Sequence, residues 1–353
     1  MKTSWRDPFG SHWLGLWLAD RADRRQGRQG RLAARRGFLK PMGEQGKVVW
    51  MLAGSQPDDI RLAVELLRAV REKRLDIRLV LTFEEDIPEL LAPLDECDKT
   101  GWGYAPCDRP SALKRAFERL SPYGFIVATS HLRPNLRQML ADQPRVIHVG
   151  QHAEDNGTMA PQQKTADLQT LLVQAQVDPN FRSLVNQGRQ RHLWWVHDSG
   201  LHSQQWHHWL ARYPEDILFV SGAQPKTRCL PISQWNRHAM ADGEIVWLDE
   251  PKWLPAVAAS VTASHFASPA RLELWQALAG NTALSIAPTT DALPTVLSDW
   301  DWRADNPQTL WEEWRLNPIR ARQAGDQARR LFWQERRQAE TVLQSLLEQV
   351  FEW

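Results

Sequence analysis

The sequence predicts an α/β protein with two doubly wound, Rossmann-like domains facing a central cleft. Short apolar runs rich in β-branched residues alternate with helical segments, a pattern typical of parallel sheets covered on both faces. The alternation occurs twice, on either side of a polar, glutamine-rich stretch at 151–190 that predicts a helical connector. The length of 353 residues is enough for two cores of ordinary size.

The first series of strands lies between an N-terminal segment and the connector. The predicted strands are 47–52, 76–83, 101–106, 123–129 and 144–149, and helices are expected over 60–72 and 111–120.

The second series follows the connector. Its predicted strands are 192–197, 216–221, 244–249, 259–264 and 282–287, with helices over 203–212, 232–240, 251–258 and 268–279, and a long helix over about 319–351. The predicted domains are therefore an N-terminal segment (1–40), a first domain (41–150), a connector (151–190), a second domain (191–317) and a C-terminal helix (318–353).

Composition excludes several classes of protein. The net charge of +1 carries no global basic field of the kind nucleic-acid binders use. Three isolated cysteines form neither a disulfide framework nor a zinc pattern, and they suit a cytoplasmic location. No apolar run is long enough to span a bilayer, and the start is not typical of a signal peptide. Dinucleotide and P-loop motifs are absent, and the histidines show no metal-ligand spacing, so no cofactor or metal is expected.

The N-terminal segment combines an apolar cluster with an arginine series. Trp13 and Trp17 lie in the cluster, and arginines including Arg24 and Arg35 then recur at helical spacing. This pattern predicts peripheral contact with an anionic membrane surface, such as the inner membrane. The alternative is a helix whose apolar end packs on the body of the protein while its arginines are solvated.

Tryptophan is unusually abundant. Nineteen are present, and 14 of them lie beyond residue 190. Trp194, Trp195 and Trp247 fall in predicted strands, and others fall in the helices beside them. We therefore expect most of them in the core of the second domain, where a large ring buries well if its N–H finds a partner.

The loop 53–59 follows the first predicted strand, where a doubly wound domain places ligand-binding groups. Ser55 can donate a hydrogen bond to an oxygen-rich ligand, and Asp58 or Asp59 can act as a general base. The alternative is that a Ser or Asp here only caps the following helix.

The run VVWMLAGSQPDD resembles the first strand and loop of the bacterial Kdo transferases, which attach 3-deoxy-D-manno-octulosonic acid (Kdo) to lipid A precursors. Their motif reads approximately W-x-H-A-x-S-x-G-E, with the Glu as base. Trp50, Ala53 and Ser55 match, Leu52 stands at the His position, and Asp58 stands at the Glu position. The resemblance thus implies that Asp58 is the catalytic base.

A second block, 104–136, resembles the family's Pro-x-Asp element and the following E-T-E-L-W-P-N element. The matching residues are Tyr104, Pro106, Asp108, Leu132, Pro134 and Asn135. The two acidic positions are Thr129 and His131, and Arg133 stands at the Trp position. By resemblance, Ser55, His131 and Asn135 line the acceptor side.

The second domain resembles the family's nucleotide-sugar domain more loosely. Ser199 stands at the Ser position of its first loop, and Arg228 corresponds to a shifted basic residue of an R-H-P-E-R element. Glu273 fits a Glu that commonly binds the nucleotide ribose. The resemblance assigns these three residues to the donor, with Arg228 pairing to phosphate.

The resemblance implies a glycosyltransferase of the GT-B type that moves a sugar, by analogy Kdo from a CMP donor, to a lipid-linked or glycan acceptor in lipopolysaccharide biosynthesis. Because the departures fall on polar positions, two alternatives stay open. In the first, the chain is an inactive paralogue that binds a ligand or acts as a scaffold. In the second, it is a GT-B transferase with another nucleotide-sugar donor.

Overall fold

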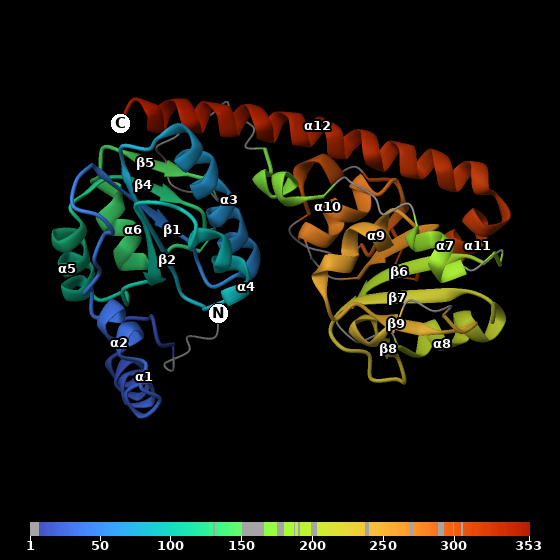
Figure 1. Cartoon of the computed structure of the whole chain (residues 1–353). Coiled ribbons are helices and arrows are strands. Elements are labelled where there is room, and N and C mark those ends of the chain that lie inside the picture. Colours follow the sequence, from blue (N-terminus) through green and yellow to red (C-terminus); the bar gives the residue numbers. More distant parts are fainter. Residues whose placement is uncertain are drawn as a thin grey trace. The chain divides into compact units, whose positions relative to one another are not determined.

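The structure of the protein is a computed structural model. It describes residues 7–129, 131–149, 166–174, 180–186, 188–189, 191–198, 203–236, 240–267, 271–288, 293–298, 300–304 and 306–353. The chain divides into two compact units, one formed by Met1–Leu168 with Glu340–Trp353 and the other by Gln169–Ala339. Figure 1 shows that each unit is built on its own sheet, with helices on both faces.

The first unit contains a parallel five-stranded sheet of order β3-β2-β1-β4-β5. Its strands are β1 (Val48–Leu52), β2 (Arg78–Phe83), β3 (Thr100–Tyr104), β4 (Pro122–Val127) and β5 (Val146–His148), so all five predicted strands are confirmed. Its helices include α3 (Pro57–Lys73), α4 (Pro88–Leu91), α5 (Pro110–Leu120) and α6 (Pro134–Ala141). The strand order reverses between β1 and β4, which makes their carboxyl ends the topological switch point.

The N-terminal segment folds as a pair of packed helices, α1 (Trp13–Arg25) and α2 (Gln29–Arg35). The predicted arginine series is not wholly on the surface, because Arg35 is buried. Its guanidinium lies 2.8 Å from a carboxylate oxygen of both Asp20 and Asp23. These pairs satisfy the buried charge and hold α1 against α2, while Trp13 and Trp17 remain exposed.

The second unit contains a parallel six-stranded sheet of order β11-β10-β6-β7-β9-β8. The strands are β6 (Leu193–Asp198), β7 (Ile217–Gly222), β8 (Leu230–Pro231), β9 (Ile245–Trp247), β10 (Ala263–Phe266) and β11 (Ala283–Ile286). Without its edge strand β8, this sheet repeats the strand order of the first. Its switch point therefore lies between β6 and β10.

Two local predictions in this unit are wrong. The strand expected at 259–264 begins only at Ala263, because the amides of Ala259–Val261 still bond to helix α9 (Leu254–Ala258). The helix expected at 232–240 is a single 3-10 turn at Ile232–Gln234 where it is described, since the chain has just paired with β9 as the edge strand β8. Residues 237–239 lie outside the described part.

The remaining helices of the second unit follow the sheet. They are α7 (Phe181–Asn186), α8 (Ser203–Arg212), α10 (Arg271–Ala279), α11 (Gln308–Leu316) and the first part of α12 (Pro318–Phe351). Short 3-10 turns lie at Leu168–Leu172, Pro251–Trp253 and Thr295–Leu297, and Ala92–Leu94 forms another in the first unit. Residues 151–165 and 175–179, half of the predicted connector, lie outside the described residues.

Tryptophan fills the core of the second unit, as predicted. Trp194 stacks on Trp311 with ring centroids 4.7 Å apart. Its indole N–H donates to a buried carboxylate oxygen of Asp216 at 2.7 Å, and that of Trp195 donates to the Ser221 hydroxyl at 2.9 Å. Two large rings are thus buried with their polar atoms satisfied.

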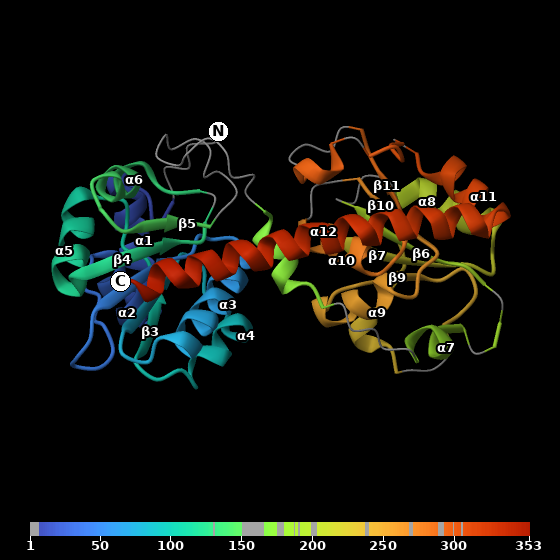
Figure 2. The same cartoon turned by 90° about the horizontal axis from the view of Figure 1, so that it is seen from above.

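The last residues of α12 belong to the first unit (Figure 2). Arg74 donates from Nη1 to the carbonyls of Val350 and Phe351 at 2.8 and 2.7 Å. These carbonyls have no partner within the helix, so the guanidinium caps its end. None of the helices in the described residues is both long and apolar enough for a bilayer span.

Candidate functional site

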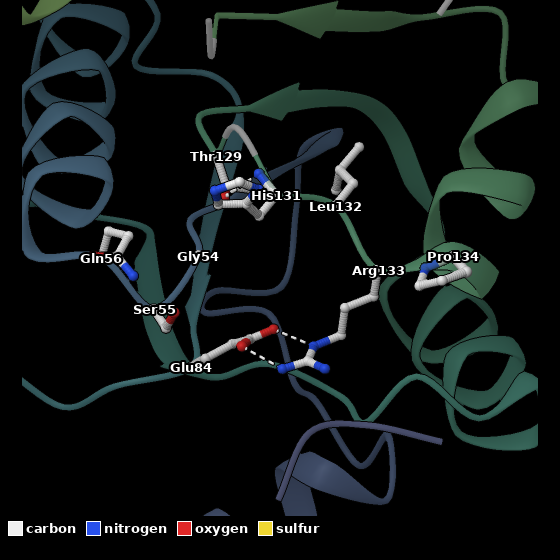
Figure 3. Close-up of a pocket in the computed structure, with 9 residues that line it drawn as sticks. All are labelled: Gly54, Ser55, Gln56, Glu84, Thr129, His131, Leu132, Arg133 and Pro134. Atoms are coloured by element: carbon white, nitrogen blue, oxygen red, sulfur yellow. Dashed lines mark hydrogen bonds and ion pairs between the residues drawn. The ribbon is translucent and has the colours of Figure 1, made fainter. Parts of the chain in front are cut away.

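A pocket of about 270 Å³ opens at the carboxyl ends of β1, β2 and β4, at the switch point of the first sheet (Figure 3). Its lining residues come from the loops that follow these three strands. They are Gly54, Ser55, Gln56, Glu84, Thr129, His131, Leu132, Arg133 and Pro134. Open α/β sheets bind ligands at this place, so we regard the pocket as the candidate site of this unit.

The loop after β1 passes very close to the loop after β4. A Cβ atom on Gly54 would lie only 2.4 Å from Oγ1 of Thr129, so a larger residue would force the loops apart. The Gly54 carbonyl also accepts a hydrogen bond from the amide of Glu84 at 3.2 Å. These contacts position Ser55 and Gln56 on the pocket wall before Pro57 starts α3.

The two acidic residues of this loop have different surroundings. Asp58 lies in the first turn of α3, with Oδ1 3.6 Å from Nη1 of Arg61 and a third of its side chain exposed. Asp59 is buried, and its Oδ2 would lie 3.3 Å from a Cβ on Gly54. Of the two, Asp59 is thus the nearer to the lining residue Gly54, and Asp58 is not among the lining residues.

The capping alternative is not what the structure shows at this helix. Gln56 is the N-cap residue and makes no side-chain capping hydrogen bond. Asp58 and Asp59 both lie in the first turn, where negative charge interacts favourably with the helix dipole.

Glu84 and Arg133 form one wall of the pocket, and Asp7, which does not line the pocket, pairs with Arg133 as well. Arg133 donates from Nε and Nη2 to the two carboxylate oxygens of Glu84 at 2.5 and 2.6 Å. It also donates from Nη1 and Nη2 to Asp7 at 2.6 and 3.2 Å. Burial by itself lowers the pKa of Arg133, but the hydrogen bonds to Glu84 and Asp7 outweigh it and raise the pKa above its usual value.

Asn135 lies beside the pocket, in contact with Asp108. Its side-chain amide donates to the Asp108 carbonyl at 2.7 Å. The buried Asp108 carboxylate in turn accepts the backbone N–H groups of Asn135 and Leu136 at 3.2 and 2.9 Å. These N–H groups belong to the first turn of α6, so Asp108 caps that helix from a distant loop.

The structure therefore brings together two of the predicted acceptor-side residues. Ser55 and His131 line the pocket, and the backbone amide of His131 donates to Oγ1 of Thr129 at 3.1 Å. Sequence reasoning missed Glu84 and gave Arg133 no role. Glu84 directly follows a predicted strand, and this same signal singled out Ser55.

In the second unit, the predicted donor residues lie on separate loops. Arg228 is exposed between β7 and β8, and Glu273 is half-buried in the first turn of α10, which follows β10. Because β7 and β10 both neighbour β6, these loops leave the same edge of the sheet. Ser199 lies outside the described residues.

The carboxyl end of β6 carries a polar group that sequence reasoning missed. His197 is nearly buried, with Nδ1 3.0 Å from Oγ of Ser221 on β7. Its ring stacks on Phe266 of β10, with centroids 5.6 Å apart. His197 therefore marks the switch point of the second sheet. Within the described ranges, no three His, Cys, Asp or Glu side chains gather as a metal ion would require.

Solved structures similar to the whole chain share its fold at low sequence identity. Anabaena HepE in complex with UDP and glucose is 10% identical, with a TM-score of 0.54 over 87% of this chain and 100% of that one. A glycotransferase of kitacinnamycin is 13% identical, with a TM-score of 0.53 over 87% and 100% of the two chains. A UDP-N-acetylglucosamine 2-epimerase is 10% identical, with a TM-score of 0.50 over 85% and 96%. Among curated proteins, none matches this chain by sequence.

The pocket lies within a segment that matches a protein-family model. The model is that of 3-deoxy-D-manno-octulosonic-acid transferase (kdotransferase), and it covers residues 30–149. The departures from the family pattern at Asp58, Thr129, His131 and Arg133 fall inside this match. Residues 30–149 therefore resemble the N-terminal domain of the Kdo transferases, with departures at these four positions, and the whole chain has the GT-B fold.

Proposed function

We propose that the protein is a glycosyltransferase that moves a sugar from a nucleotide-sugar donor, by family resemblance CMP-Kdo, to a lipid-linked or glycan acceptor. The single observation that supports it most is the pocket at the first switch point, inside the segment that matches the Kdo transferase family. Ser55 and His131 supply hydrogen-bonding groups for acceptor hydroxyls there, and Asn135 lies at its edge.

We assign the donor to the carboxyl edge of the second sheet. Arg228 pairs with the phosphate and Glu273 accepts from the ribose hydroxyls, with Ser199 beside them, as the family resemblance implies. One structural relative is solved with UDP and glucose, so UDP-glucose is a second donor to test beside CMP-Kdo.

Asp58 is the proposed base. In transfer, its carboxylate takes the proton of the acceptor hydroxyl as the oxygen bonds to the anomeric carbon, and the nucleotide leaves with the electron pair of the broken bond. Asp has a shorter reach than the family's Glu by one C–C bond. Oδ1 of Asp58 lies 3.6 Å from Nη1 of Arg61, which is the neighbouring cation on the same helix.

The test compares Asp58→Asn with a matched control on the same helix. Glu65 pairs with Arg68 three residues later, as Asp58 does with Arg61, so Glu65→Gln removes an equivalent charge away from the pocket. Release of CMP from CMP-Kdo, or of UDP from UDP-glucose, is measured with a lipid A precursor as acceptor. We expect Asp58→Asn to reduce turnover by at least about 100-fold, the usual contribution of a general base, and Glu65→Gln to leave it unchanged. Equal turnover in Asp58→Asn and wild type would refute the assignment.

A second candidate is a ligand-binding paralogue without transferase activity. The observation that favours it is the replacement of both acidic positions of the second block by Thr129 and His131. Such a protein binds a sugar or nucleotide but releases no nucleotide from any donor. Binding without turnover in the wild-type protein would therefore select this candidate.

We also propose that α1 rests on an anionic membrane surface. Trp13 and Trp17 are 64% and 50% exposed, and Arg24 is exposed farther along the same helix. An adjoining side of the helix, about a quarter turn away, is occupied, since Leu16 is buried and Asp23 pairs with Arg35. Aromatic rings at the headgroup level beside basic side chains suit an interfacial helix.

A further inference from the structure

We propose that Glu84 and Arg133 make the acceptor pocket selective for a sugar unit that carries an ammonium or hydroxyl groups, and against a phosphorylated one. This inference rests on the proposed function in taking the pocket as the acceptor side. It concerns a wall of the pocket that the family motifs do not assign.

The carboxylate of Glu84 lies on the wall of the pocket. Two acidic positions of the family pattern are Thr129 and His131 in this chain, on the loop after β4. Glu84 brings a carboxylate to the same pocket from the loop after β2, which lies on the other side of β1 from β4. It is only 16% exposed, and Arg133 holds it from Nε and Nη2 (Figure 3). The pocket therefore has a fixed acceptor of hydrogen bonds.

The guanidinium of Arg133 has nearly all of its hydrogen-bond donors in use. Arg133 makes four hydrogen bonds, two to Glu84 and two to Asp7. A guanidinium has five N–H donors, so one is left for a ligand. Although arginine is the usual side chain for binding phosphate, Arg133 is already matched by two carboxylates in the fork geometry a phosphate would need.

The charges around Arg133 do not balance. Two carboxylates, those of Glu84 and Asp7, oppose its single positive charge. A pocket with excess negative charge attracts a cation or a neutral hydrogen-bond donor and repels a phosphate. Its volume of about 270 Å³ is just below the roughly 300–1,000 Å³ of ordinary ligand sites, so it takes one sugar unit.

The experiment measures binding of three probes that differ in charge: glucosamine, glucose and glucose 6-phosphate. Dissociation constants are measured by NMR titration of the full-length protein at pH 7, without nucleotide. For the wild type we expect glucosamine to bind best and glucose 6-phosphate worst. In Glu84→Gln, Asp7 alone opposes Arg133, so the excess negative charge is gone and the preference among the three probes should disappear. Each charged probe should shift by about tenfold, the effect of one charge-assisted hydrogen bond.

Two further variants complete the design. Glu85→Gln is the matched control, because Glu85 is exposed next to Glu84 and does not line the pocket, and it should keep the wild-type order. Arg133→Gln makes the pocket more acidic, so glucosamine should bind at least as well as to wild type and glucose 6-phosphate should stay the weakest. This variant decides the matter if circular dichroism shows that Glu84→Gln does not fold.

The proposal is overturned if glucose 6-phosphate binds the wild type best, if Glu84→Gln keeps the wild-type order, or if none of the probes binds up to its solubility. It is also overturned if Arg133→Gln strengthens binding of glucose 6-phosphate. Because no donor is present, these results are independent of turnover. If the protein binds the probes in the expected order but shows no transferase activity, this inference stands and the proposed transferase function is refuted.

Discussion

Asp108 shows how one buried carboxylate determines the geometry of the candidate site. It accepts two backbone N–H groups of α6, and Asn135 donates back to its carbonyl. Residues 27 and 28 positions apart are thus joined, which holds the loop carrying His131 and Arg133 in place. The matches to the family at Asp108 and Asn135 therefore have a structural explanation beside the functional one.

We predict that Asp108→Ala lowers the free energy of unfolding by about 2 kcal/mol, because it leaves the half-buried first turn of α6 without its cap. The control is Asp142→Ala, at the exposed C-terminal end of the same helix, which should change stability by less than about 0.5 kcal/mol. Urea denaturation followed by circular dichroism measures both values. Similar losses in the two variants would contradict the capping role.

At the scale of elements, one side of helix α1 packs on the protein through Leu16, and another side exposes Trp13 and Trp17. We expect the exposed side to bind the membrane. The double substitution Trp13→Ala with Trp17→Ala should reduce co-sedimentation with phosphatidylcholine–phosphatidylglycerol vesicles by about tenfold or more, because interfacial burial of two rings is lost. Arg24→Gln should weaken binding by about 1 kcal/mol on these vesicles, which contain an anionic lipid, and should not weaken binding to vesicles of phosphatidylcholine alone.

The matched control for this helix is Trp102→Ala. Trp102 is 43% exposed but lies on β3, outside α1, so its removal should leave vesicle binding unchanged. Vesicles of phosphatidylcholine alone should bind the wild-type protein more weakly, since they lack the anionic charge. Equal binding of the double variant and the wild type would refute the membrane contact.

The end of helix α12 depends on a second ion pair. Asp76 accepts from Arg74 at 2.7 Å, and this hydrogen bond lowers the pKa of Asp76 to about 2. A lowered pKa in the folded state means that the pair stabilises the protein above about pH 4 and that this contribution is lost as the pH falls towards 2. Arg74 is then held less firmly on the carbonyls of Val350 and Phe351.

We therefore predict that the amides of the last two turns of α12 exchange hydrogen faster as the pH falls from 4 to 2, beyond the intrinsic pH dependence of exchange. In Asp76→Asn the faster exchange should already be present at neutral pH. Glu96→Gln, which removes an exposed carboxylate of the same unit, should behave as wild type. Mass-spectrometric hydrogen exchange resolves this segment, and unchanged protection in Asp76→Asn would show that Arg74 needs no partner.

On the scale of the whole molecule, the two units differ in how many fluorescent tryptophan side chains they contain. Thirteen of the 19 tryptophans lie within Gln169–Ala339, and Trp194, Trp195, Trp275, Trp311 and Trp314 are fully buried there. Intrinsic fluorescence thus mainly follows unfolding of the second unit, whereas far-UV circular dichroism follows both.

This difference gives a test of where the donor binds. At a nucleotide concentration of 100 times Kd, mass action stabilises the binding unit by about 2.7 kcal/mol. We predict that CMP or UDP raises the unfolding midpoint measured by fluorescence by several degrees. GDP is measured in the same way as the comparison nucleotide. A shift seen by circular dichroism and not by fluorescence would place the nucleotide on the first unit and contradict the proposed donor side.

The sequence alone determined the fold class and the places where ligands are expected. Strands buried on both faces must be continuous apolar runs, and this local constraint places nine of the ten predicted strands within two residues of their observed ends. The exception is β10, whose start depends on where α9 ends. The tertiary structure decided which side chains meet. Adjacent residues of a helix point in different directions, so the sequence does not tell which of the two neighbouring acidic residues at the start of α3 faces the pocket loops. Only the packed loops show that Asp59 and Thr129 both lie close to Gly54. The pairing of Arg133 with Glu84 and Asp7 joins residues 49 and 126 positions apart, and no local pattern encodes such contacts.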